Sequence, residues 1–250
     1  MKRFFVWLVL SILFPFVSIS GDSSLKVLIL SGRNNHEWQK TTPFLVDILN
    51  RSGIFTVFVT NQPDTITSGY LEKFDVILNN WNSWPENDLL WPAEPGNALL
   101  RFIENGGGFV TFHASTSVFY QWPDFQKIVT AAWIQDTTSH GKCSETEVII
   151  TDPNHPVTKG MNNFVLFDEL WINAGSNPEF TPLGYATNAV LTTNGSPPQP
   201  AIFVATYGKG RIFHTILGHD TRAMENKGFI SVLLRGTEWS ATGKVTQQNY

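Results

Sequence analysis

The sequence predicts a single α/β domain built on a doubly wound, mainly parallel β-sheet. Short apolar runs of strand length alternate with helix-like segments through the first half of the chain, which is the pattern of right-handed βαβ units. The 250 residues are 42% hydrophobic and 15% charged, which is enough apolar material for one large core. No repeat or low-complexity stretch separates a second domain.

The first half of the chain supplies four expected strands and two expected helices. The strands are residues 25–30, 55–59, 75–78 and 109–112, and the first is the continuous apolar run LKVLIL that a strand buried on both faces requires. Thr42-Pro43 is expected to open a helix that runs through Leu49, with Gly53 just past its end. Residues 97–104 are expected to form an amphipathic helix closed by three consecutive glycines.

The second half is less regular but still gives recognisable elements. Residues 145–151 alternate as a strand does, and residues 201–206 and 211–217 are expected to form a hairpin around Tyr207-Gly208-Lys209-Gly210. Residues 224–239 are expected to form a closing helix. Its apolar face carries Phe229, Val232, Leu233 and Trp239.

The N-terminus predicts export. Lys2 and Arg3 precede the apolar run of residues 4–17, which ends in Ser18-Ile19-Ser20, the small residues of a cleavage site. Pro15 breaks this run, which is shorter than the roughly 20 residues that span a bilayer. We therefore expect a signal peptide over residues 1–20, a mature domain over residues 25–243, no membrane attachment after cleavage, and a periplasmic or secreted protein.

Composition narrows the class of partner. The net charge is −4 and no basic patch is evident, which argues against nucleic acid. Nine tryptophans are many for this length; indole faces bind sugar rings, although they also pack cores. A single cysteine, Cys143, excludes an intramolecular disulfide. The expected partner is a small carbohydrate, and a homo-oligomer is left open.

Polar residues follow the ends of four expected strands. In open α/β sheets, ligands bind outside the carboxyl ends of the strands, so these residues are expected to share one rim. They are His36, Asn80, Trp81, His113, His219 and Asp220. His155 and His214 are interpreted as structural, the first in a loop and the second inside an apolar strand.

Two chemistries suit such a set, and the residues alone do not choose between them. Neutral imidazoles with a carboxylate act as general acids and bases, and they also bind a divalent transition metal. Asp168 and Glu169 are adjacent on a strand, so only one can face the rim, and we expect Glu169, which has the longer reach. A serine hydrolase is disfavoured because no GxSxG occurs and His113 holds the strand corner. Cys143 lies in a loop, which disfavours a cysteine amidotransferase.

Four blocks of sequence, in their order and spacing, resemble the ThuA-like (trehalose-utilisation) family. They are GGGFVTFHA, SHGKCSETEVIITDPNHPVTKGM, FDELW and YGKGRIFHTILGHD, and the resemblance runs from about Val27 to Trp239. It implies a flavodoxin-like three-layer sandwich of the class I glutamine amidotransferase type without the cysteine nucleophile. It also implies carbohydrate catabolism, commonly alongside sugar-oxidising dehydrogenases that make 3-keto-glycosides.

The resemblance also implies site residues. The family's polar positions are matched by His36, Trp38, His113, His140, Asp168, Glu169, His219 and Asp220. Two departures concern the substrate: Ala131-Ala132-Trp133 stands where relatives often have Gly-Gly-Ala-Trp, and Trp171 replaces a frequent tyrosine.

The leading hypothesis is an exported enzyme that cleaves glycosides or 3-keto-glycosides, with or without a divalent transition metal. The expected catalytic residues are His113, His140, Glu169 and His219. The expected substrate-binding residues are His36, Trp38, Asn80, Trp81, Trp133, Asp168 and Asp220. The alternative is a non-catalytic sugar-binding module on an amidotransferase-like scaffold.

Overall fold

A nine-stranded mixed sheet forms the centre of the molecule. The computed structural model describes residues 24–86, 91–176 and 179–249, so the expected signal peptide lies outside the described residues. Strand order is β2-β1-β3-β4-β13-β12-β11-β7-β8. Five neighbouring strands run parallel: β2 (Phe55–Thr60), β1 (Leu25–Leu30), β3 (Val76–Asn79), β4 (Gly108–Phe112) and β13 (Gly210–Thr215). The sheet continues in antiparallel steps through β12 (Gln199–Tyr207), β11 (Thr181–Asn188), β7 (Ser144–Ile150) and β8 (Phe164–Asp168).

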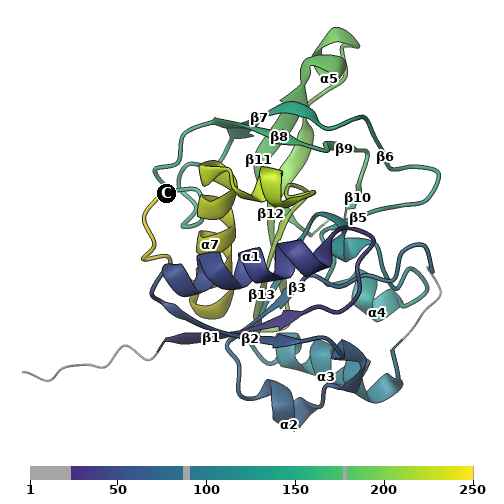
Figure 1. Ribbon diagram of the computed structural model, residues 1–250, viewed down its shortest axis with the longest axis vertical. Coiled ribbons are helices and arrows are strands. Elements are labelled where there is room, and N and C mark those ends of the chain that lie inside the picture. Colours follow the sequence, from purple (N-terminus) through teal and green to yellow (C-terminus); the bar gives the residue numbers. More distant parts are fainter. Residues whose placement is uncertain (1–23, 87–90, 177–178, 250) are drawn as a thin grey trace, which may run out of the picture.

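Helices cover both faces of the parallel half, which makes three layers (Figure 1). One face packs against α1 (Trp38–Arg51) and α7 (Lys227–Thr242), and the other packs against α3 (Ala93–Glu104), which contacts α2 (Ser68–Leu71). This architecture confirms the predicted α/β class and its amidotransferase-like layering. The smaller elements are η1 (Pro63–Thr65), η2 (His113–Thr116), α4 (Pro123–Gln126), α5 (Ala189–Thr193), α6 (Thr221–Met224), and the short pairs β5 (Ala131–Ala132) with β10 (Gly175–Ser176) and β6 (Ser139–His140) with β9 (Trp171–Ile172).

The apolar run at β1 explains why the sheet is buried on both faces. Val27 and Ile29 enter the core under α1 and α7, while Leu28 and Leu30 enter the core under α3. All four side chains are fully buried. Because successive side chains point to opposite faces, a strand with a helix layer on each side must be apolar wherever it is covered, and Lys26 lies in the exposed first part of β1.

Three helix boundaries differ from expectation, and one of them is the start of α3, at Ala93 rather than at residue 97. Helix α1 begins at Trp38 rather than at Thr42, and Pro43 lies inside it. The turn ahead of the proline is held by Thr41 and Thr42, whose hydroxyls accept hydrogen bonds from the Asn80 amide at 3.0 and 2.9 Å. These bonds compensate for the single backbone bond that a proline removes in the second turn. The expected helix over residues 224–239 corresponds to α7, which begins at Lys227: Met224 ends the separate short helix α6, and the side chain of Asn226 caps α7 at Gly228 N.

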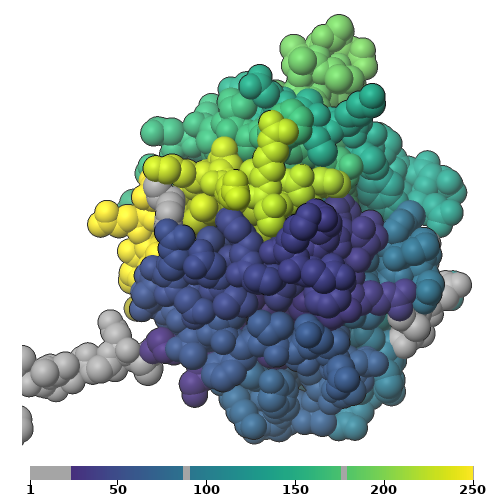
Figure 2. Space-filling view, viewed as in Figure 1, coloured from purple at the N-terminus to yellow at the C-terminus, as the bar shows by residue number. Residues whose placement is uncertain are grey.

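The first and last parts of the chain pack side by side. Helix α1 contacts both α6 and α7, and Figure 2 shows the purple N-terminal segment against the yellow-green C-terminal segment on one face. This packing brings the loop after β1 close to the loop after β13. Among the described residues, no helix combines the length and apolar character needed to cross a membrane.

Candidate functional site

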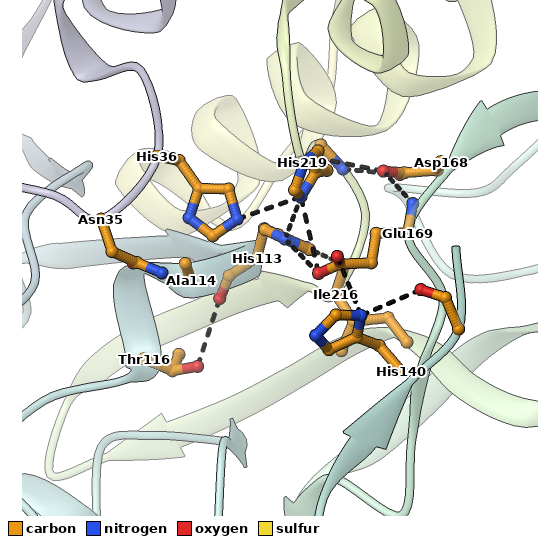
Figure 3. Close-up of polar contacts among 12 residues, drawn as sticks. Asn35, His36, His113, Ala114, Thr116, His140, Asp168, Glu169, Ile216 and His219 are labelled. Atoms are coloured by element: carbon orange, nitrogen blue, oxygen red, sulfur yellow. Dashed lines mark hydrogen bonds and ion pairs between the residues drawn. The ribbon is translucent and has the colours of Figure 1, made fainter. Parts of the chain in front are cut away.

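Three histidines and one glutamate converge at a single edge of the sheet. His36 follows β1, His113 follows β4, His219 follows β13 and Glu169 follows β8. Four successive antiparallel pairings give β8 the same direction as β13, so all four residues lie beyond carboxyl ends of strands. We call these four residues the histidine–glutamate cluster (Figure 3).

The cluster is tight. The Nδ1 atom of His219 lies 3.0 Å from His36 Nε2 and 3.2 Å from His113 Nε2. The Oε2 atom of Glu169 lies 3.5 Å from His219 Nδ1 and 3.6 Å from His113 Nε2. One ligand atom from each of the four residues lies within 4.8 Å of every other. Three ring nitrogens and one carboxylate oxygen therefore point at a common centre.

A strained corner positions His113. Its φ of 40° lies in the left-handed region, which costs an L-residue about 1–2 kcal/mol, and the sharp turn from β4 into η2 directs the side chain, which is 1% exposed, beyond the end of the strand. The ring Nδ1 donates to the carbonyl of Ile216 at 2.8 Å. Because a carbonyl only accepts, the proton of the neutral ring is fixed on Nδ1, and Nε2 presents a lone pair to the cluster.

A buried carboxylate positions His219. Asp168 is 1% exposed and accepts hydrogen bonds from the backbone N–H groups of Gly218 at 2.7 Å, His219 at 3.1 Å and Glu169 at 2.9 Å. Gly218 has a φ of 101°, and a Cβ there would lie 2.6 Å from the ring of Phe229, so only glycine fits. Asp168 thus fixes the backbone that carries two members of the cluster.

The electrostatics of the cluster keep the carboxylate ionised. Burial alone would raise the pKa of Glu169, but the contacts with the His113 and His219 rings outweigh burial and hold this pKa below its ordinary value. The hydrogen bond to Glu169 raises the pKa of His219. Burial, reinforced by the neighbouring His113 and His219, lowers the pKa of His36 to about 3. His36 is therefore a neutral imidazole at physiological pH.

This donor set suits a divalent transition metal. Imidazole nitrogen and carboxylate oxygen are ordinary ligands of zinc and its neighbours. Four ligands about 2.0–2.1 Å from one ion, arranged tetrahedrally, stand about 3.3 Å from one another. The cluster's closest nitrogen and oxygen pairs are 3.0–3.6 Å apart.

His140 adds a fifth titratable group at the rim of the cluster. Its Nδ1 lies 2.9 Å from Glu169 Oε1 and 2.9 Å from the carbonyl of Gly141. Both partners accept, so Nδ1 carries a proton, and the second ring nitrogen is turned away from Glu169 (Figure 3). Glu169 therefore faces the cluster with one oxygen and His140 with the other.

A cleft of about 600 Å³ opens over these groups. Three indoles line it next to the cluster: Trp133 packs edge-on against both Trp84 and Trp171, and Trp171 also contacts His113. The remaining lining residues are Asn35, His36, Glu37, Gln39, Ala114, Ser117, His140, Glu169, His219 and Asp220. Trp84 and Trp171 are additions to the expected set. Their position in tryptophan-rich segments close to Asn80-Trp81 and Asp168-Glu169 is the signal that points to them.

Four expected substrate-binding residues lie elsewhere. Trp81 is 6% exposed and packs against Trp91 and Phe119 in the core, and Asn80 is buried against Thr41 and Thr42, so neither lines the cleft. The loop after β3 directs both side chains inward, toward these buried partners.

Asp168 and Trp38 are the other two. The carboxylate of Asp168 accepts hydrogen bonds from backbone N–H groups, as described above. Trp38 does not line the cleft, although its neighbours Glu37 and Gln39 do. Trp133 and Asp220, by contrast, do line the cleft.

The two histidines interpreted as structural lie away from the cleft. His214 is fully buried, and its Nδ1 pairs with the Thr111 hydroxyl at 2.6 Å. His155 Nδ1 accepts from Val157 N at 3.2 Å, and its ring packs on Trp239.

Comparison with known proteins now decides the family. The family model ThuA, described as trehalose utilisation, matches residues 26–240. The chain belongs to the ThuA family. A ThuA-like protein from Parabacteroides merdae ATCC 43184 is 32% identical, with a TM-score of 0.78 over 90% of this chain and 93% of that one. A ThuA-like protein from Bacteroides uniformis ATCC 8492 is 21% identical, with a TM-score of 0.68 over 90% and 94% of the two chains.

The amidotransferase-like fold of this ThuA chain is also visible in a more distant structure. A protein described as one component of the GMP synthase of Thermoplasma acidophilum shares 14% identity and a TM-score of 0.54, over 88% of this chain and 96% of that one. This likeness confirms the fold alone. No curated protein matches the chain.

Proposed function

We propose that the cleft is the active site of an exported, metal-assisted enzyme of carbohydrate catabolism. The observation that carries the proposal is the histidine–glutamate cluster, in which three ring nitrogens and one carboxylate oxygen lie within 4.8 Å of one another, with four contacts of 3.0–3.6 Å among them. The indoles beside it offer flat apolar faces to the C–H side of a sugar ring. Membership of the trehalose-utilisation family supports a carbohydrate substrate, and the charged and apolar leader supports export to the periplasm or beyond.

The substrate we propose is a 3-keto-glycoside. A ketone at C3 acidifies the C2–H bond, and the glycosidic oxygen on C1 then stands in the position of a leaving group. Loss of the C2 proton to a base forms the C1–C2 double bond while the C1–O bond breaks, and the departing oxygen takes up a proton. A metal held by the three histidines and Glu169 of the cluster would supply Lewis acidity toward the sugar's oxygens.

His140 is the proposed base. Glu169 and the carbonyl of Gly141 hold its Nδ1 proton, so the neutral ring presents the lone pair of Nε2. The side chain of His140 is 43% exposed, and its ring packs against Trp133. A sugar bound to the indoles would contact the His140 ring there. The proton that His140 gains is the one available to the leaving oxygen.

Turnover of a 3-keto-glucoside with a nitrophenolate leaving group, by the metal-loaded protein, tests the proposal. We expect His140→Gln to lower kcat by about 100-fold or more, as loss of a general base does, with KM little changed. His155→Gln is the matched control, because His155 lies outside the cleft, and its kcat should equal that of the wild type.

Unchanged kcat in His140→Gln would remove His140 from the mechanism. Binding of the keto-glucoside without turnover by the wild-type protein would favour the other hypothesis, a non-catalytic sugar-binding module.

A further inference from the structure

The loop after β3 holds an asparagine at the junction of two cluster-bearing loops. We infer that Asn82 is a positioning residue that sets the separation of His36 and His113, an inference that rests on the proposed function of the cluster. Asn82 does not line the cleft, and its side chain is fully buried. It acts through the loops that it joins rather than on a substrate.

The Asn82 amide uses both of its ends. Its Nδ2 donates to the side-chain oxygens of Asn34 at 2.9 Å and Asn35 at 2.7 Å, and to the carbonyl of Ala114 at 3.0 Å. Its Oδ1 accepts from the backbone N–H groups of Asn35 at 3.3 Å and Trp84 at 3.1 Å. One amide group thus contacts the loops after β1, β3 and β4.

Asn34 passes this restraint to His36. The Oδ1 atom that accepts from Asn82 also accepts from the backbone N–H of His36 at 2.9 Å. The other end of the Asn34 amide donates to the Asn80 carbonyl at 3.2 Å and to Asn80 Oδ1 at 3.3 Å. The backbone of His36 is therefore tied to the end of β3 by two side-chain amides in series.

Ala114 passes the same restraint to His113. The Ala114 carbonyl follows directly after the left-handed corner at His113, and its hydrogen bond from Asn82 holds that corner against relaxation. The rings of His36 and His113 meet edge to face with centroids 4.9 Å apart.

The chemistry at this position requires an amide. A carboxylate at residue 82 would place a buried negative charge against three acceptors, and an apolar side chain would remove one donor from each of those acceptors. Outer contacts that orient metal ligands change metal affinity by about 10–100-fold when they are removed.

Two readouts on Asn82→Ala test the inference. The first is the nuclear Overhauser effect between the ring protons of His36 and His113 in the metal-free protein. The second is the Kd for Co²⁺, read from its visible absorption. We expect the ring-to-ring effect to be lost and the Kd to rise by about 10–100-fold. Asn82→Ser, which keeps a small polar group, gives the same readouts if the alanine variant does not fold.

Thr237→Ala is the matched control, because Thr237 is fully buried and hydrogen-bonded on α7, away from both loops. It should lower stability and leave both readouts at wild-type values. Retention of the ring-to-ring effect and of the wild-type Kd in the Asn82 variants would overturn the inference. Absence of Co²⁺ binding in the wild type would instead contradict the proposed metal function, and the ring-to-ring effect would still decide the role of Asn82.

Discussion

His36 Nε2 lies 3.0 Å from His219 Nδ1, although the two histidines are 183 positions apart in the chain. Packing of α1 against α6 brings their loops together, and β4 adds His113 from between them. Two ring nitrogens at this distance share one proton or bind one ion. An ion that replaces the shared proton releases it to solvent, and this release can be measured.

Metal binding should therefore release a proton. The hydrogen bond to Glu169 raises the pKa of His219 above the ordinary histidine value, so His219 stays protonated at a higher pH than a free histidine. A metal must displace that proton, and metal affinity should fall as the pH falls through this raised pKa. Calorimetry in two buffers of different ionisation enthalpy measures the proton released. A metal affinity that stays constant between about pH 5 and about pH 8, the range in which histidines titrate, would contradict this.

Asp168→Asn should weaken the hydrogen bonds that hold the backbone of His219 and Glu169. In this variant the amide NH2 group faces backbone N–H donors that bind a carboxylate oxygen in the wild type. The donor left without an acceptor lowers the unfolding free energy by about 1–3 kcal/mol. Because two of these donors belong to Gly218 and His219, Co²⁺ affinity should fall as well. Denaturant unfolding and Co²⁺ titration measure the two effects. Wild-type stability in this variant would mean that Asp168 does not hold the end of β13.

His113→Gly should be more stable than His113→Ala. Both variants lose the ring, but only glycine adopts a φ near 40° without strain, and the difference should be about 1 kcal/mol. At an ordinary helical position the order is reversed. Unfolding midpoints of the two variants decide the point, and an alanine variant of equal or greater stability would show that the corner relaxes.

Replacement of Trp81 should mainly lower stability, whereas replacement of Trp133 should mainly weaken substrate binding. Trp81→Ala removes a core side chain and should cost about 3–5 kcal/mol of stability. Trp133→Ala removes a half-buried wall of the cleft, so it should raise the KM for the keto-glucoside by about tenfold at a smaller cost in stability. A Trp133→Ala variant with wild-type KM would remove the indole from substrate binding.

The sequence predicts the part of the site that depends on strand ends. The apolar runs locate β1, β4 and β13, and parallel strands bring the residues that follow them to one edge, so the meeting of His36, His113 and His219 is predictable. The class of fold follows from the same pattern. Pro43 wrongly predicts that the helix begins at Thr42, because the Asn80 contacts with the turn ahead of the proline come from the loop after β3.

Side-chain direction in the loops is harder to predict. Asn80, Trp81 and Asn82 are adjacent, and only the buried partners of each determine that all three turn inward. Strand alternation does separate Asp168 from Glu169, but it does not show that Asp168 binds the backbone of His219. Trp84 reaches the cleft from a loop and Trp171 from the two-residue strand β9, and neither segment is long enough to have a periodic signature.

Metal content of the purified wild-type protein and of His219→Ala, measured by elemental analysis after equilibration with Zn²⁺ and removal of free ion, tests the central claim most directly. His155→Ala is the control, since His155 contacts Trp239 and Val157 rather than the cluster. We expect one tightly held zinc per chain in the wild type and in the control, and none in His219→Ala. Wild-type protein without bound zinc, or zinc retained in full by His219→Ala, would contradict the assignment of the cluster as a metal centre.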